Sequence, residues 1–323
     1  MNICVVGAGA MGLLFGTRLA AAGFTVSVLA RGATLPALRE HGLRLDDADG
    51  RTAHPVLASD DPTALGAQDL VLLTTKAPAL PALADSLGPL LHAETMVLSI
   101  GNGLPWWFGA AADGSSLTSL DPQGKLSAAL PQTRIVGAVA YLHSRRTAPG
   151  IAEHVEGRRL LLGEPAGQVS PRVTLLADMF RTAGFDATAT TDIRKELWTK
   201  LWGTITVSPI SLLTGVGCDL ILADSLVERL VLAVMNEVEA VGSAVGCAMT
   251  QTAQERNHVT RGLGAFKPSM ARDAEAGLPV ELDAIVTAVH ELAQRHEIAT
   301  PQLDTLLGLA RLRARALRVY PDG

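Results

Sequence analysis

The chain has 323 residues, of which 48% are apolar and 18% are charged, so it can bury a substantial core and is not intrinsically disordered. Lys and Arg number 27 against 32 Asp and Glu, which gives a formal charge of −5 and excludes the basic surface typical of a nucleic-acid-binding protein. This length predicts two domains of ordinary size.

A strand is predicted over residues 2–6 and an amphipathic helix over 10–22. Continuous apolar runs then predict further strands that are covered on both faces; they span residues 25–30, 69–75, 95–100, 134–141 and 158–162. Their alternation with helical segments predicts an α/β fold with a doubly wound parallel sheet. The stretch 111–132 is rich in Gly, Ser, Asp and Pro, and we expect it to form a long surface excursion.

From about Thr190 the strand signals stop and helical periodicity continues to Arg318. We therefore predict an N-terminal nucleotide-binding domain over 1–190 and an all-helical domain over 191–323. The uncharged run 201–218 is long enough to span a bilayer. However, it contains several glycines and hydroxyl side chains, and Pro209 should kink or end the helix, so we expect a buried helix with a polar side.

The three cysteines, Cys4, Cys218 and Cys247, are odd in number and form no CxxC or Cys/His cluster. The sequence thus predicts free thiols in a reducing cytoplasm, with no disulfide framework and no metal site. We expect contact with neither membrane nor nucleic acid, and the sequence leaves a homodimer open.

The sequence Gly7-Ala8-Gly9-Ala10-Met11-Gly12 lies between the first predicted strand and the first helix. In this context the pattern indicates a dinucleotide site: Gly7 allows a tight turn, Gly9 lets the backbone approach a pyrophosphate, and Gly12 allows close packing of the helix on the sheet. The pyrophosphate would lie at the helix N-terminus. The alternative is a purely structural glycine turn.

The second strand is followed by Arg31, and no acidic residue occurs between Gly12 and Glu40. An NAD site usually has Asp or Glu here, whereas an arginine suits the 2′-phosphate of NADPH. We therefore predict NADPH; the alternative is an ordinary surface arginine. Lys76 and Asn102 follow the next strands, at the edge where ligands bind in such sheets, although Asn102-Gly103 is equally well a simple turn.

Lys200 is followed by eighteen uncharged residues. On a continuous helix, Lys200, Thr204 and Ser208 would form a polar stripe. A lysine in apolar surroundings tends to have a lowered pKa, which suits a proton donor. The alternative is a surface ion pair with Glu196, four residues earlier.

The helix predicted from about Pro279 has an apolar face, formed by Leu282, Ile285, Val286, Val289 and Leu292. Glu281 lies on this apolar side, where a carboxylate needs a partner such as Lys200. The alternative is that Glu281 only compensates the helix dipole.

Together these motifs resemble the ketopantoate reductases (2-dehydropantoate 2-reductases) along nearly the whole chain. The resemblance rests on GAGAMG, Arg31, TTK ending at Lys76, GNG around Asn102, ELWTKLWG around Lys200, KPSM with Asp273 and EAG at 275–277, and PVELD around Glu281. It implies a Rossmann-type domain, a helical domain and NADPH-dependent reduction of ketopantoate to pantoate, on the route to pantothenate and coenzyme A.

The resemblance also implies roles for single residues: Lys200 as general acid, Glu281 as the group that positions it and holds a substrate hydroxyl, Asn102 near the nicotinamide ribose and the substrate, Ser269 on the substrate carboxylate, and Arg31 and Lys76 on the cofactor. One departure concerns the asparagines that the family usually has four and eight residues after the lysine. Here Thr204 and Ser208 occupy those positions. This keeps two alternatives open: reduction of a different 2-oxo acid or an imine, and a non-catalytic NADPH-binding sensor.

The pair Trp106-Trp107 also departs from the shorter members of the family. It predicts either an aromatic lid or, as the simpler interpretation, side chains that pack the following segment down.

Overall fold

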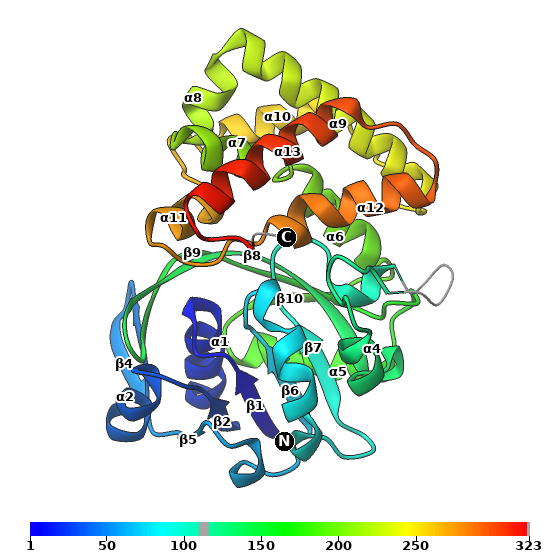
Figure 1. Cartoon of the computed structure of the whole chain (residues 1–323). Helices are drawn as coiled ribbons and strands as arrows, with labels where there is room; N and C mark the ends of the chain where they lie inside the picture. Colours follow the sequence, from blue (N-terminus) through cyan, green and yellow to red (C-terminus); the bar gives the residue numbers. More distant parts are fainter. Residues whose placement is uncertain (110–115, 322–323) are drawn as a thin grey trace. The chain divides into compact units, whose positions relative to one another are not determined.

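The computed structural model describes residues 1–109 and 116–321, which form two compact units (Figure 1). The first unit comprises residues 1–101 and 123–193, and the second comprises 102–122 and 194–323. Residues 102–122, which the sequence analysis places in the N-terminal domain, therefore group with the helices that follow residue 193.

The first unit is built on a ten-stranded sheet of order β4-β3-β9-β8-β7-β6-β1-β2-β5, with β10 paired to β9. Parallel pairing joins its central strands, β1 (Asn2–Val6), β2 (Thr25–Leu29), β5 (Leu57–Ser59), β6 (Leu70–Leu73), β7 (Met96–Ser99) and β8 (Ile135–Ala148). The remaining strands are β3 (Leu43–Asp47), β4 (Gly50–His54), β9 (Ile151–Gly163) and β10 (Asp186–Ala189). The predicted doubly wound sheet is confirmed.

Apolar side chains on both faces of the central strands form the core of this unit. The helices are α1 (Ala10–Ala21), α2 (Thr34–His41), α4 (Lys125–Ala129) and α5 (Pro171–Thr182), and the 3-10 turns are η1 (Pro62–Ala64), η2 (Ala77–Ala79), η3 (Pro81–Ser86), η4 (Gly88–Leu90) and η6 (Gln132–Arg134). Phe15 of α1 stacks on Phe185 and meets Phe180 of α5 edge to face. All three rings are buried, which ties α1 and α5 into one core.

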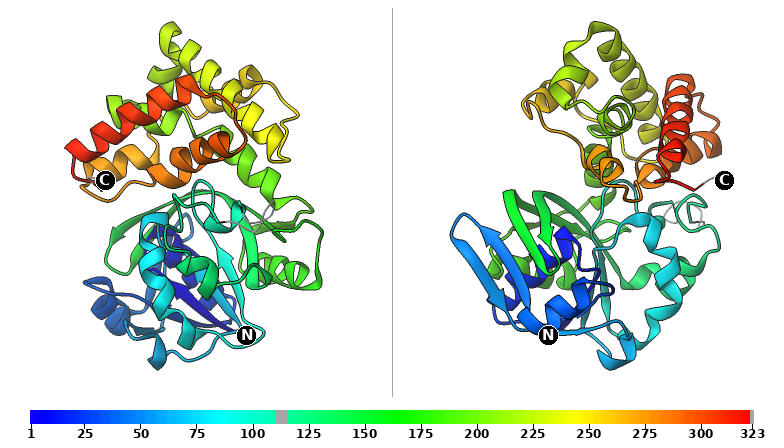
Figure 2. Two further views of the ribbon diagram at one scale, coloured as in Figure 1. Left: turned by 45° about the vertical axis from the view of Figure 1, so that its right-hand side comes forward. Right: turned by 60° about the vertical axis from the view of Figure 1, so that its left-hand side comes forward.

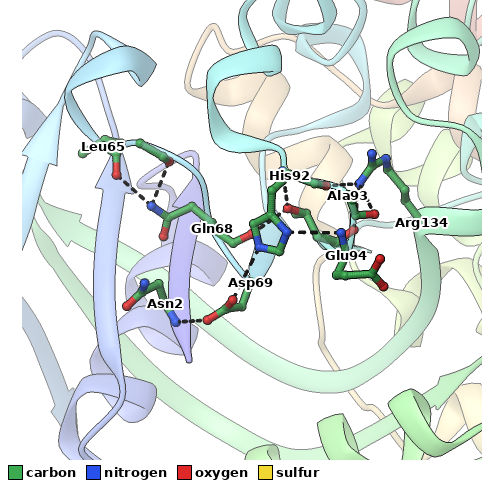
Figure 3. Close-up of polar contacts among 10 residues, drawn as sticks. Asn2, Leu65, Gln68, Asp69, His92, Ala93, Glu94 and Arg134 are labelled. Carbon is green, nitrogen blue, oxygen red and sulfur yellow. Dashed lines mark hydrogen bonds and ion pairs between the residues drawn. The ribbon is translucent and has the colours of Figure 1, made fainter.

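Polar contacts close the edge of the sheet at which the parallel strands begin (Figure 3). The Asn2 amide donates to Asp69 at 2.7 Å, and His92 contacts the other oxygen of Asp69 at 3.5 Å. The hydrogen bond from Asn2 is the main reason that the pKa of Asp69 is lowered. The guanidinium of Arg134 donates to the carbonyls of His92 and Ala93. These side chains join the starts of β1, β6, β7 and β8, so this edge has a structural role.

Two segments differ from the predictions of the sequence analysis. The stretch 111–132 is not a simple surface excursion, because its leucines at 117, 120, 126 and 130 are buried; residues 110–115 lie outside the described residues. Residues 34–59 form α2, β3, β4 and β5, for which we predicted no element. These elements are short, and β4 is largely exposed, so they lack the continuous apolar runs of the central strands.

In the described residues of the second unit, every regular element is helical, as predicted (Figure 2). The helices are α6 (Ile193–Trp202), α7 (Val207–Thr214), α8 (Cys218–Ala223), α9 (Ser225–Ala244), α10 (Ala253–Arg261), α11 (Ser269–Glu275), α12 (Ala288–Arg295) and α13 (Pro301–Ala316), with the 3-10 turn η5 (Trp106–Phe108) and the π-helical turn η7 (Asp283–Thr287). The predicted apolar face from Leu282 to Leu292 is buried.

The single buried helix predicted over 201–218 is wrong, because α6 ends at Trp202 and α7 begins at Val207. The predicted kink at Pro209 is also wrong. Pro209 lies in the first turn of α7, where proline is tolerated because an N–H has no intrahelical partner there. No helix in the described part of the chain is both long and apolar enough to cross a bilayer.

Hydrogen bonds and ring contacts hold the described residues of 102–122 on the rest of the second unit. Leu104 donates its backbone N–H to Ala284, Phe108 stacks on Trp198 of α6, and Ser119 donates its N–H and hydroxyl to Glu291 of α12. Trp106 and Trp107 are both buried, so the packing interpretation of this pair is confirmed.

Candidate functional site

The glycine loop at residues 7–12 connects β1 to α1. Gly7 has a φ of +102°, a conformation that favours glycine. A Cβ on Gly12 would lie 2.0 Å from the Gly7 carbonyl oxygen, so the start of α1 packs directly on the loop backbone. A Cβ on Gly9 would meet nothing within 4 Å. The loop therefore leaves open space at Gly9 and none at Gly12.

The loop lies where the strand order reverses, since β1 pairs with β2 on one side and with β6 on the other. Val6 is in register with Leu29 and with Leu73, which places Arg31 and Lys76 just beyond the ends of the flanking strands. Ligands in doubly wound sheets bind at this switch point. The structure thus brings the predicted cofactor residues of the first unit to one edge of the sheet.

This edge fits the pyrophosphate of a dinucleotide. Helix α1 starts at Ala10, and within the described residues its first turn has neither an acidic residue nor a side-chain cap, so Ala10, Met11 and Gly12 offer N–H groups to an anion. Ala8 completes the turn. The hydroxyl of Thr75, beside Gly7, is buried without a hydrogen-bond partner, which leaves one more polar group for a ligand.

Sequence reasoning missed the role of Thr74. Its hydroxyl lies 2.7 Å from the Gly7 carbonyl and 3.1 Å from the Val6 carbonyl, so it fixes the loop from the β6 side. The only signal in the sequence was its position directly after an apolar strand.

In the second unit, Lys200 lies near the end of α6 and is partly buried. Its Nζ donates to Oδ1 of Asn102 at 3.1 Å. Burial lowers the pKa of Lys200 to about 8, and the negative charge of Glu281 opposes this shift. Lys200 is therefore still mostly protonated at neutral pH but can lose its proton more readily than an exposed lysine.

Glu281 lies two residues before the start of the turn η7 and is buried, with 6% of its surface exposed. A buried carboxylate needs a compensating charge, and the attraction to Lys200 provides one. The residues come from distant parts of the sequence, so the helical packing of this unit is what brings Lys200, Asn102 and Glu281 together.

Asn102 is positioned by a close backbone contact. Gly103 has a φ of +77°, and a Cβ on it would lie 2.2 Å from the Ala284 carbonyl oxygen. Leu104 donates its N–H to the same oxygen at 2.7 Å. The Asn-Gly sequence therefore forms a turn, and the same turn presents Asn102 to Lys200. Ala284 belongs to the π-helical turn η7, a feature that the sequence analysis did not predict and that often marks functional sites.

The predicted polar stripe of Lys200, Thr204 and Ser208 on one helix is wrong, because α6 ends before Thr204. The Thr204 hydroxyl donates to the carbonyl of Leu201, in the last turn of α6, at 3.0 Å. Ser208 is buried in the first turn of α7. Ser269 begins α11, which packs against α7.

Sequence reasoning also missed Arg256. Its guanidinium lies where a Cβ on Gly203 would be, so this glycine makes room for a cation at the end of α6. The position suits the negative end of the helix dipole. In the sequence, Arg256 stands in a polar stretch of α10 that gave no sign of this contact.

The cysteines are free and buried. Among the described residues, no three His, Cys, Asp or Glu side chains gather as metal ligands do.

Two family models match the chain, one in each half of the sequence. The family model "Ketopantoate reductase PanE/ApbA" matches residues 3–167, and the model "Ketopantoate reductase PanE/ApbA C terminal" matches 192–314. The chain belongs to the ketopantoate reductase family. It is accordingly an oxidoreductase of the 2-dehydropantoate 2-reductase type, a nicotinamide-dependent class.

The chain is 40% identical to a 2-dehydropantoate 2-reductase from Mesorhizobium japonicum over 96% of this chain and 97% of that one. Its fold matches a protein from Ralstonia solanacearum MolK2, provisionally assigned to the ketopantoate reductases, with a TM-score of 0.96, 45% identity and 99% coverage of both chains. A 2-dehydropantoate 2-reductase from Geobacter metallireducens GS-15 matches with a TM-score of 0.85 at 31% identity, over 97% of this chain and 99% of that one.

The glycine loop generates a paired prediction. We expect Gly12→Ala to destabilise the protein, by about 1–3 kcal/mol, because its Cβ would overlap the Gly7 carbonyl. Gly9→Ala should fold with nearly wild-type stability but bind the reduced nicotinamide cofactor at least about tenfold more weakly, because its Cβ would occupy the space left for the pyrophosphate. Thermal unfolding and fluorescence titration with NADPH and with NADH measure the two effects. Wild-type affinity for the cofactor in Gly9→Ala would contradict the assignment of the loop.

Proposed function

We propose that the chain reduces ketopantoate to pantoate with NADPH, on the route to pantothenate and coenzyme A, and that Lys200 is the general acid. The observation that carries this proposal is the placement of Lys200 between Asn102 and Glu281, with a pKa of about 8. A group with such a pKa can donate a proton at neutral pH and recover it from solvent.

The cofactor assignment rests on Arg31. It is exposed and follows β2, whose end pairs with Val6 directly before the glycine loop. An exposed guanidinium there offers two parallel hydrogen bonds to a 2′-phosphate. Lys76 follows β6 on the other side of β1 and would contact the cofactor from there.

Bound NADPH would supply the hydride that reduces the carbonyl carbon. As negative charge develops on the carbonyl oxygen, Lys200 donates a proton from Nζ and becomes a neutral amine. Asn102 holds Nζ through its side-chain oxygen, and Glu281 keeps Lys200 charged before the reaction. We further propose that Asn102 contacts the nicotinamide ribose and that Glu281 accepts a hydrogen bond from the substrate hydroxyl.

Ser269 would hold the substrate carboxylate, and Thr204 and Ser208 would line the same site. A second candidate function is reduction of another 2-oxo acid or an imine, because these two residues lack the amide groups of asparagine. The non-catalytic sensor is less favoured, since Lys200, Asn102 and Glu281 form a complete acid site. Cytoplasmic location and a homodimer stay predictions, as do the proposed domains 1–190 and 191–323.

Lys200→Ala should lower kcat by about 10²- to 10⁴-fold while NADPH binding is nearly unchanged, because the variant loses the proton donor and leaves the glycine loop intact. In the wild type we expect kcat to fall above about pH 8, as the Lys200 ammonium loses its proton. Lys195→Ala on the same helix is the matched control and should behave like the wild type. Wild-type turnover of Lys200→Ala would remove this lysine from the mechanism.

Arg31→Ala should raise the Kd for NADPH by about ten- to a hundredfold and change the Kd for NADH little, since a lost charge-assisted hydrogen bond costs about 1.5–3 kcal/mol. Isothermal titration with both cofactors measures the ratio. Arg51→Ala, which removes another exposed arginine of the first unit, should leave the ratio unchanged. If Arg31→Ala weakens the binding of NADPH and NADH equally, Arg31 does not recognise the 2′-phosphate.

A substrate panel tests the reaction itself. We expect ketopantoate to give the highest kcat/KM among branched and unbranched 2-oxo acids and cyclic imines, followed by loss of NADPH absorbance. A higher kcat/KM for an imine or for another 2-oxo acid than for ketopantoate would favour the second candidate function. Tight NADPH binding with no turnover of any compound would favour the sensor.

A further inference from the structure

The segment after α13 turns back toward the residues that carry Glu281. Arg318 is in the left-handed conformation, with a φ of +57°. Its N–H donates to the Arg315 carbonyl at 2.8 Å, and the Val319 N–H donates to the Ala314 carbonyl at 3.0 Å. This pair of bonds is a Schellman motif, which ends a helix and reverses the chain.

Two hydrogen bonds then join this segment to the residues on either side of Glu281. The Val280 N–H donates to the Val319 carbonyl at 3.1 Å, directly before Glu281. The Tyr320 hydroxyl donates to Oδ1 of Asp283 at 2.5 Å, two residues after Glu281. The backbone that carries Glu281 is thus held at both ends by adjacent residues, Val319 and Tyr320.

The phenol of Tyr320 is suited to remain a hydrogen-bond donor. Burial and the neighbouring Asp283 raise its pKa, while Arg311 and Thr287 act in the opposite direction. The guanidinium of Arg315 lies 6.0 Å from the centre of the tyrosine ring. At neutral pH the phenol therefore keeps its proton, and a charge-assisted bond to a carboxylate is among the stronger hydrogen bonds in proteins.

Asp283 is also the first residue of the turn η7. The same turn contains Ala284, whose carbonyl accepts the N–H of Leu104 and so fixes the backbone next to Asn102. Tyr320 therefore holds the turn from one side while the segment after Asn102 holds it from another. A shift of this turn would move both partners of Lys200.

We propose that Tyr320 is a positioning residue that acts through Asp283 to hold Glu281 against Lys200. The inference rests on the proposed function of Lys200 as general acid. The family model for the C-terminal part matches residues 192–314, so it includes Asp283 but not Tyr320. Tyr320 itself touches neither substrate nor cofactor in this scheme.

Tyr320→Phe tests the proposal, because it removes one hydroxyl and keeps the ring. We expect kcat/KM for ketopantoate to fall about three- to tenfold, which is less than the full effect of a lost hydrogen bond to a charged group because Tyr320 acts only through Asp283. In the pH profile of kcat, the fall at alkaline pH (the alkaline limb) should also move to lower pH. The reason is that a less firmly held Glu281 opposes the lowering of the pKa of Lys200 less than in the wild type. Glu281 is the charged group that acts on Lys200, whereas Asp283, Arg311 and Arg315 face Tyr320.

Two further variants separate positioning from general stability. Asp283→Ala should reproduce both effects, and adding Tyr320→Phe to it should change neither further, since residues that act in series are not additive. Arg318→Gly relieves the left-handed conformation without removing the phenol, so it should raise Tm and leave the alkaline limb in place.

The inference is overturned if Tyr320→Phe keeps the wild-type kcat/KM and alkaline limb while Lys200→Ala abolishes activity. It is also overturned if Tyr320→Phe lowers Tm but leaves the limb unmoved, since that result describes a purely structural contact. If Lys200→Ala retains the wild-type limb, the proposed function fails first, so the two failures are distinguishable.

Discussion

The attraction between the partly buried ammonium of Lys200 and the buried carboxylate of Glu281 is the constraint on which the candidate site of the second unit depends. Removing Lys200 from water favours its neutral form, and the charge of Glu281 favours its protonated form. Neither group is stable there alone, because an unpaired buried charge costs several kcal/mol. The balance leaves a lysine that is charged at neutral pH but close to releasing its proton, which is the property that proton donation requires.

Close backbone contacts provide the rigidity that this pair needs. Gly103 lies against Ala284 and Gly12 lies against Gly7, in each case with a separation that admits no side chain. Contacts of this kind fix positions more firmly than long side chains do, because little rotamer freedom remains. Gly103, which in the sequence is equally well a simple turn residue, therefore positions the candidate site in one unit, while Gly12 fixes the glycine loop in the other.

The sequence predicted the central strands and the glycine loop, and it indicated Lys200 and Glu281 as candidate site residues, because each is a local signal. Buried strands are continuous apolar runs, and a charge within an apolar pattern is conspicuous. The helix ends after Trp202 and not at Pro209, where we predicted it. At this end Gly203 lies against Arg256 of α10, a contact with a distant part of the sequence that no local signal indicates. The turn η7 and the burial of the leucines near 120 likewise depend on contacts with distant segments.

If Thr204 lines the substrate site, as we propose, its hydroxyl affects the choice of substrate. Its hydroxyl proton is used by the Leu201 carbonyl, so Thr204 can accept a hydrogen bond from a ligand but does not donate one. An asparagine at this position could do both. Donors to a substrate in this unit must therefore come from other groups, of which Lys200 is already committed to proton transfer in our scheme. A substrate that offers its own hydroxyl as a donor, as pantoate precursors do, suits such a site better than one that offers only acceptors.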